Sequence, residues 1–179
     1  MAGVNYFAIW TTLLRLPDFE VAHVHEDTEL KRLSITLISK HSMGVCPDCG
    51  AVCDDVKQRR TREGIHDLPM GRNSVELKVR VNQYACGVCE RCFTPPLPFL
   101  AEGSHATERF LERAAQLIRQ SDVLSASRFL GVPERSLDRW YCDYVERQLQ
   151  AATAAPLKPI RRLGIDELSL KKSTDSSSP

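Results

Sequence analysis

The chain has 179 residues, of which 42% are hydrophobic and 26% charged, and its formal net charge is +1. This composition is that of an ordinary globular protein, and the small charge excludes a polybasic protein that attracts nucleic acid through its overall field. Its seven cysteines are odd in number, and no cleavable signal sequence or membrane-spanning apolar run is evident. We therefore expect a cytoplasmic protein, not bound to a membrane, whose cysteines bind metal.

The first half of the chain shows a short helical pattern followed by strand patterns. Apolar residues at helical spacing predict a helix within residues 1–18, ending at Pro17. The stretch from 65 to 73, with its proline, glycine and asparagine, is interpreted as a turn. Alternating apolar residues predict strands at 19–25, 33–38 and 75–84.

Two Cys-x-x-Cys pairs, Cys46 with Cys49 and Cys86 with Cys89, stand before and after that turn. A separation of two residues lets both sulfurs of a pair reach one ion, and two such pairs form the ligand set of a closed structural Zn²⁺ site. We predict that these four bind Zn²⁺, whose removal should unfold the N-terminal half and spare the later helices. Cys53 is interpreted as a packing thiol and Cys92 as the better candidate for a replacement ligand. The alternative is a set of reduced, buried cysteines without metal.

Helical periodicity begins after a proline-rich linker at 95–98. It predicts helices at about 107–120 and at 124–130, the latter with Ala126, Phe129 and Leu130 inward, and a third helix along the apolar stripe from Leu137 to Leu149.

A short helix, a glycine-containing turn at 131–133 and a longer helix form the pattern of a helix-turn-helix. Arg135, Ser136 and Arg139 lie at the start of the second of these helices, where side chains reach base edges and phosphates. Pro133 departs from the usual serine or threonine cap. The alternative is a plain helical bundle whose charged face is solvated.

The last part of the chain has a strand pattern at 163–170, with Asp166 at its centre, and a serine-rich tail. In this order the motifs resemble bacterial insertion-sequence transposases of the ISL-three type, over roughly residues 15–172. The resemblance rests on Cys46-Pro47-Asp48-Cys49-Gly50, Arg59-Arg60-Thr61-Arg62, Asp67-Leu68-Pro69, Tyr84-Ala85-Cys86, Phe93-Thr94 and Gly164-Ile165-Asp166-Glu167.

The resemblance implies that Asp166 is the first of three acidic residues in an RNase H-like catalytic domain, where they hold two Mg²⁺ ions. The chain departs from the family here, because it stops 13 residues after Asp166 and the other two acids are missing. Mg²⁺ is expected only in a complete catalytic domain, so we do not expect this chain alone to cut DNA. Arg59, Arg60 and Arg62 are included among the expected DNA-binding residues.

The sequence thus predicts an α+β protein with four parts: a β-rich, zinc-ribbon-like domain with an N-terminal helix at 1–98, an all-α helix-turn-helix domain at 104–150, a truncated RNase H-like segment at 160–172 and a disordered tail at 173–179. The expected function is binding of double-stranded DNA at an element's terminal repeats by part of a truncated transposase. Another copy or a full-length transposase is the expected protein partner. Two alternatives stay open: a stand-alone DNA-binding regulator or transposition inhibitor, and a zinc-ribbon module that binds proteins.

Overall fold

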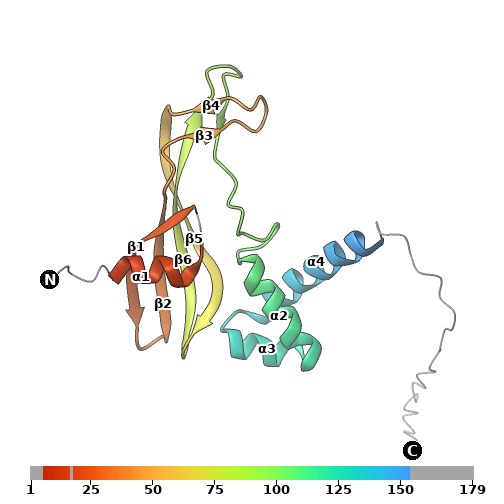
Figure 1. The fold of residues 1–179 in the computed structure, drawn as a ribbon. Coiled ribbons are helices and arrows are strands. Elements are labelled where there is room, and N and C mark those ends of the chain that lie inside the picture. The colour runs from red at the N-terminus through yellow and green to blue at the C-terminus, as the bar shows by residue number, and fades with distance from the viewer. Residues whose placement is uncertain (1–5, 17, 154–179) are drawn as a thin grey trace, which may run out of the picture.

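The computed structural model describes residues 6–16 and 18–153 of the chain. It confirms a mixed α+β fold, in which a helix and a β-sheet precede a group of helices (Figure 1). The elements are α1 (Tyr6–Leu14), β1 (Phe19–Asp27), β2 (Arg32–Ser39), β3 (Gly44–Val45), β4 (Val52–Cys53), β5 (Val56–Met70), β6 (Asn73–Ala85), β7 (Cys92–Phe93), α2 (Glu108–Gln120), α3 (Val123–Leu130) and α4 (Glu134–Thr153).

The main sheet has the strand order β1-β2-β6-β5, and β7 adds to the end of β6. Its strands are antiparallel except for β2 and β6, which run parallel. Alternate residues of β2 and β6 are buried, among them Ile35, Leu37, Leu77 and Val79, so the predicted strand patterns are confirmed. Together with Leu14 at the end of α1, they form the apolar core of the sheet.

The predicted turn at 65–73 is wrong, because β5 continues through it to Met70. Ile65 pairs with Leu77 and Asp67 with Val75, and only Gly71 and Arg72 connect β5 to β6. Pro69 lies at a register shift between Asp67 and Met70, on a strand at the edge of the main path. Edge strands and irregular pairings are where a sheet tolerates proline, so the proline does not end the strand.

The helices α2, α3 and α4 pack around a second apolar cluster that includes Phe110, Leu130, Leu137 and Trp140. Their bounds agree with the predicted helices to within a few residues. Two inward assignments are wrong: the side chain of Phe129 is 72% exposed, and Leu149 is exposed near the end of α4. The buried face of the short helix α3 consists of Ala126, Ser127 and Leu130, and Phe129 lies outside it.

One buried carboxylate joins the sheet to the helices. Asp67 on β5 accepts hydrogen bonds from the Thr107 hydroxyl, at 2.7 Å, and from the Arg109 guanidinium. Arg109 also donates to the carbonyl of Leu14 at 2.6 Å, so it touches the end of α1 as well. Thr107 in turn caps α2 by accepting from the Phe110 amide. We call Asp67, Thr107 and Arg109 the clasp.

Some expectations lie outside the described residues. These are the catalytic-type segment at 160–172, which contains Asp166, and the tail at 173–179. Within the described part of the chain, no helix combines the length and apolar character that crossing a bilayer requires. The proposed division near residue 98 stays a prediction.

Candidate metal centre

Two short hairpins with the same architecture carry the four predicted ligands. In the first, β3 pairs with β4 through Gly44–Cys53 and Val45–Val52. In the second, the end of β6 pairs with β7 through Tyr84–Phe93 and Ala85–Cys92. The residue numbers of each pair in the second hairpin are those of the first hairpin plus 40. The two hairpins therefore have the same length and the same strand pairing.

The turns of the two hairpins are also held by matching hydrogen bonds. In the first, the Gly50 amide donates to the Cys46 carbonyl at 2.9 Å and the Cys46 amide to the Ala51 carbonyl at 2.8 Å. In the second, Glu90 donates to Cys86 and Cys86 to Arg91, over the same distances. Gly50 and Glu90 both have positive φ, at 74° and 55°. The tight turn therefore requires the left-handed region at this position, whichever residue occupies it.

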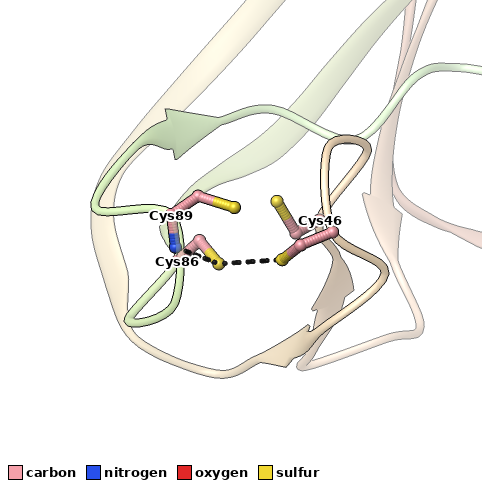
Figure 2. Close-up of side chains that lie close together, drawn as sticks. Cys46, Cys86 and Cys89 are labelled. Carbon is pink, nitrogen blue, oxygen red and sulfur yellow. Dashed lines mark hydrogen bonds between the residues drawn. The ribbon is translucent and has the colours of Figure 1, made fainter.

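The turns bring the sulfurs of Cys46, Cys49, Cys86 and Cys89 within 4.8 Å of one another. The sulfurs of Cys49 and Cys86 are 3.5 Å apart. Figure 2 shows Cys46, Cys86 and Cys89 lying close together. Zinc–sulfur bonds of about 2.3 Å in a tetrahedron place the sulfurs roughly 3.8 Å apart, so the cluster has the size of a zinc site. Four sulfur ligands leave no open position, so the ion would hold the hairpins together and would not act on a substrate.

The thiols themselves favour a cation among them. The backbone N–H of Cys89 points at the Cys86 sulfur, 3.4 Å from the nitrogen, and is the main cause that lowers the pKa of Cys86 to about 6. A hydrogen bond with the Cys49 side chain is the main cause that raises the pKa of Cys89 to about 12. One sulfur is thus prepared as a thiolate while its neighbour keeps a proton, and a bound cation would stabilise all four as thiolates.

Cys53 and Cys92 lie outside this group. Cys53 ends the first hairpin, where it is buried beside Tyr84 and donates a weak hydrogen bond to the Ala51 carbonyl at 3.5 Å. Burial raises the pKa of Cys53 to about 11, which suits a packing thiol. Cys92 is exposed on β7, opposite Ala85. The preference for Cys92 as a replacement ligand therefore has no support in the geometry.

The arginines proposed to contact DNA form two groups on different elements, one on β5 and one on α4. Arg59, Arg60 and Arg62 are exposed on the first half of β5. Arg135 and Arg139 are exposed in the first turns of α4, with Ser136 half-buried beside them. The structure therefore places the candidate residues on two surfaces, one on the sheet and one on the helices.

Sequence reasoning missed the clasp and the ring cluster next to it. His66 lies between Phe110 and Trp140, with ring centroids 6.0 and 5.9 Å away, and burial lowers the pKa of His66. Pro69 and Gly71, which follow Asp67, favour a turn, and turns lie at the surface. The predicted turn therefore gives no reason to expect that His66 or Asp67 packs against other elements.

Comparison with known proteins reveals a distant similarity. Over 146 residues, or 79% of this chain, the sequence is 27% identical to the transposase for insertion sequence element IS1001 of Bordetella parapertussis. The alignment covers 34% of that transposase, so the chain spans about a third of the length of the curated relative it matches. No protein-family model and no solved structure matches the chain. The chain is therefore distantly similar to a transposase.

Proposed function

We propose that the described residues are the DNA-binding part of a transposase-related protein, with the helix-turn-helix as its reading element. The similarity to a transposase over 79% of the chain is the observation that carries this proposal. The expected target is double-stranded DNA at the ends of a mobile element. The finer resemblance to the ISL-three type belongs to the same proposal.

The arrangement of α3 and α4 supports a helix-turn-helix. Asp122 caps α3 by accepting from the Ser125 amide at 2.8 Å, and Gly131 ends it in the left-handed region, with φ 69°. α4 then starts at Glu134, and its exposed first turns carry Arg135 and Arg139. Arginine at the start of a recognition helix can donate two hydrogen bonds to guanine or bind phosphate.

The proposed role of zinc is structural, because its four ligands close the coordination shell. Among the described residues, no group of three or more carboxylates could hold the Mg²⁺ ions of strand transfer. We propose that this part of the molecule binds DNA and carries out no chemical step of its own. A second copy or a full-length transposase is the proposed protein partner, and the division into domains at 1–98 and 104–150 belongs to this proposal as well.

The test is binding of the zinc-loaded chain to duplexes selected from a random-sequence pool, followed by fluorescence anisotropy on the enriched duplex. Arg135→Ala and Arg139→Ala should each weaken binding by about 1–3 kcal/mol and relax the preferred sequence. Arg119→Ala, at the exposed end of α2, is the matched control and should change neither. Failure to enrich any sequence, with no binding to duplex DNA, would refute the proposal.

One observation favours a second function, that of a zinc-dependent protein-binding module. Val45, Val52 and Val88 are 61%, 65% and 74% exposed around the cysteine cluster, and apolar side chains at such a tip suit a protein contact. This function predicts no DNA binding in the selection above. A stand-alone regulator or inhibitor would bind the same DNA, and adding the chain to a transposition reaction distinguishes that case by reduced transposition.

A further inference from the structure

In the first half of β5 no side chain is buried. Residues 56–63 are all exposed, although they pair with β6, whose Val79 and Val81 are buried. On this part of the sheet six cationic side chains accompany one carboxylate, that of Glu63, whereas the whole chain carries a net charge of only +1. We call residues 56–63 with 78–85 the basic ribbon; its cations are Lys57, Arg59, Arg60, Arg62, Lys78 and Arg80.

The lysines of the ribbon form ion pairs, whereas one of its arginines, Arg60, donates a hydrogen bond to the neutral side chain of Gln58 at 3.2 Å. Lys57 lies 3.1 Å from Asp55, and Lys78 lies 3.8 Å from Glu63. No ion pair to any of the four arginines exists within the part of the chain that the structure describes, and each of them is exposed. A guanidinium group without an ion pair favours binding of an anion such as phosphate.

The strand register divides these arginines between the two faces of the ribbon. Arg60 and Arg62 stand opposite Val81 and Val79, so they lie on the face that carries the core. Thr61 stands opposite Arg80, which places Arg80 on the other face together with Arg59, two residues before Thr61. Because β5 is at the end of the strand order, positive charge flanks a sheet edge on both sides.

The distance between the basic ribbon and α4, the proposed recognition helix, follows from a contact between the turn before α4 and the start of β6. A Cβ atom added at Gly131, in the turn before α4, would lie 3.7 Å from the Cβ of Ser74 at the start of β6. Six residues of β6 lead from Ser74 to Arg80, which is about 20 Å in a strand. That distance corresponds to roughly 6 base pairs along a duplex. The clasp also connects β5 of the ribbon to α2 of the helical group.

We propose that the basic ribbon is a second contact surface for the same DNA duplex, in which Arg59 and Arg80 on one face and Arg60 and Arg62 on the other bind phosphates. This inference rests on the proposed function and adds Arg80 to the residues that bind. Contacts to phosphate position a protein without reading sequence, so the ribbon strengthens binding whereas the first turns of α4 supply the sequence preference.

The test compares the salt dependence of binding for the zinc-loaded full chain and two double variants, R59Q/R80Q and R60Q/R62Q. The probes are the enriched duplex at about 26 base pairs, a version of about 10 base pairs centred on the preferred sequence, and one single strand of the longer probe. On the long duplex, each double variant should reduce the slope of log K against log salt by about 2, without changing the preferred sequence. R113Q/R119Q on α2 is the charge-matched control and should keep the wild-type slope.

The short duplex supplies the geometric part of the test. It extends only about 5 base pairs, or roughly 17 Å, to each side of its centre, so it should lose most of the contacts to the ribbon. The ribbon variants should therefore differ from the wild type clearly less on the short duplex than on the long one. Unchanged slopes on the long duplex would overturn the inference while leaving the proposed function standing. Slope changes confined to the single strand would overturn the assignment to duplex DNA.

If the wild-type chain binds no duplex, the proposed function fails and this inference with it. The arginines could instead serve only to prevent edge-to-edge pairing between copies. In that case the variants bind DNA normally and self-associate in analytical ultracentrifugation, which also overturns the inference. Because all four side chains are exposed, circular dichroism and zinc content should match the wild type in every variant.

Discussion

At the scale of single residues, one matched position of the two hairpins is occupied by glycine in the first and by glutamate in the second. Gly50 and Glu90 have the same hydrogen-bond role and both have positive φ, but only glycine adopts that region without steric cost. Glu90→Gly should therefore stabilise the zinc-loaded protein by about 0.5–1 kcal/mol, and Gly50→Ala should destabilise it by about 1–2 kcal/mol.

Urea unfolding at a fixed excess of zinc measures both substitutions. Gly87→Ala serves as the control, because that glycine has no positive φ and no atom near its missing side chain. The stability changes of Glu90→Gly and Gly50→Ala should have opposite signs but need not be equal in size. A loss of stability in Glu90→Gly would contradict the interpretation, because it would mean that the carboxylate side chain stabilises the turn.

His66 provides a prediction about pH. Burial between Phe110 and Trp140 lowers the pKa of His66 below its ordinary value of 6.5, and the charged groups that act on it are Glu76, Arg32 and His105. As pH falls below about 6.5, the unfolded chain takes up a proton at His66 that the folded chain does not, so folding stability falls. Between pH 7.5 and 5.5 the loss from this residue should reach up to about 1 kcal/mol.

His66→Phe isolates that contribution, since phenylalanine keeps the ring contacts and cannot titrate. The stability of wild type minus that of the variant, from urea unfolding with zinc in excess, should decrease toward pH 5.5. Protonation of the metal ligands affects both proteins alike and cancels in this difference. A difference that is independent of pH would show that the pKa of His66 is the same in the folded and unfolded states, and would contradict the prediction.

The sequence predicted the cysteine group well and the clasp not at all, for a physical reason. A Cys-x-x-Cys pair is local chemistry, and its two-residue spacing alone brings both sulfurs to one ion. Asp67, Thr107 and Arg109 meet only because β5 and α2 pack together across some 40 residues. Nothing in the neighbourhood of Asp67 along the chain indicates that it is buried with a partner.

At the scale of elements, the clasp is the connection that orients α2 on the sheet. Asp67 has almost no exposed surface and accepts from both Thr107 and Arg109. Asp67→Asn would leave the Arg109 charge without its partner, and removing one member of such a pair costs about 3–5 kcal/mol. We expect a decrease of that size in the free energy of unfolding, measured with urea.

A second ion pair of the same region is the control. Glu108 accepts from Arg147 at 3.1 Å, but its side chain is about half exposed, so Glu108→Gln should cost less than about 1 kcal/mol. Amide hydrogen exchange adds a structural readout, because Asp67→Asn should release protection at the start of α2 before that of β6. Equal stability of the two variants would contradict the assigned role of the clasp.

Element prediction succeeded wherever one face of an element is buried. The period of two in β2 and β6 and the spacing of three and four in α4 record which side chains meet the core. It failed for β5, whose first half buries nothing and whose second half contains Pro69. That strand exists because β6 provides a partner along most of its length, and such pairing leaves no periodic signal in β5 itself.

At the scale of the whole molecule, the metal centre is separate from the apolar core. The cysteines pack with Tyr84 and Phe93 in a cluster of their own, whereas the core of the sheet runs from Leu14 to Leu97. From the structure we therefore expect zinc loss to unfold less than the whole N-terminal half. Zinc should control the two hairpins, and the sheet should persist without it.

Chelation tests this directly. With a zinc chelator, amides at 44–53 and 84–93 should lose protection from hydrogen exchange, because without the metal only a few backbone hydrogen bonds and one small apolar cluster hold the turns. Amides of Ile35 and Leu77 and the fluorescence of Trp140 should remain native, since these residues are buried in the other two clusters. The wild-type chain with zinc restored is the control and should recover protection. Loss of protection at Ile35 and Leu77 together with the hairpins would show that the metal supports the whole sheet.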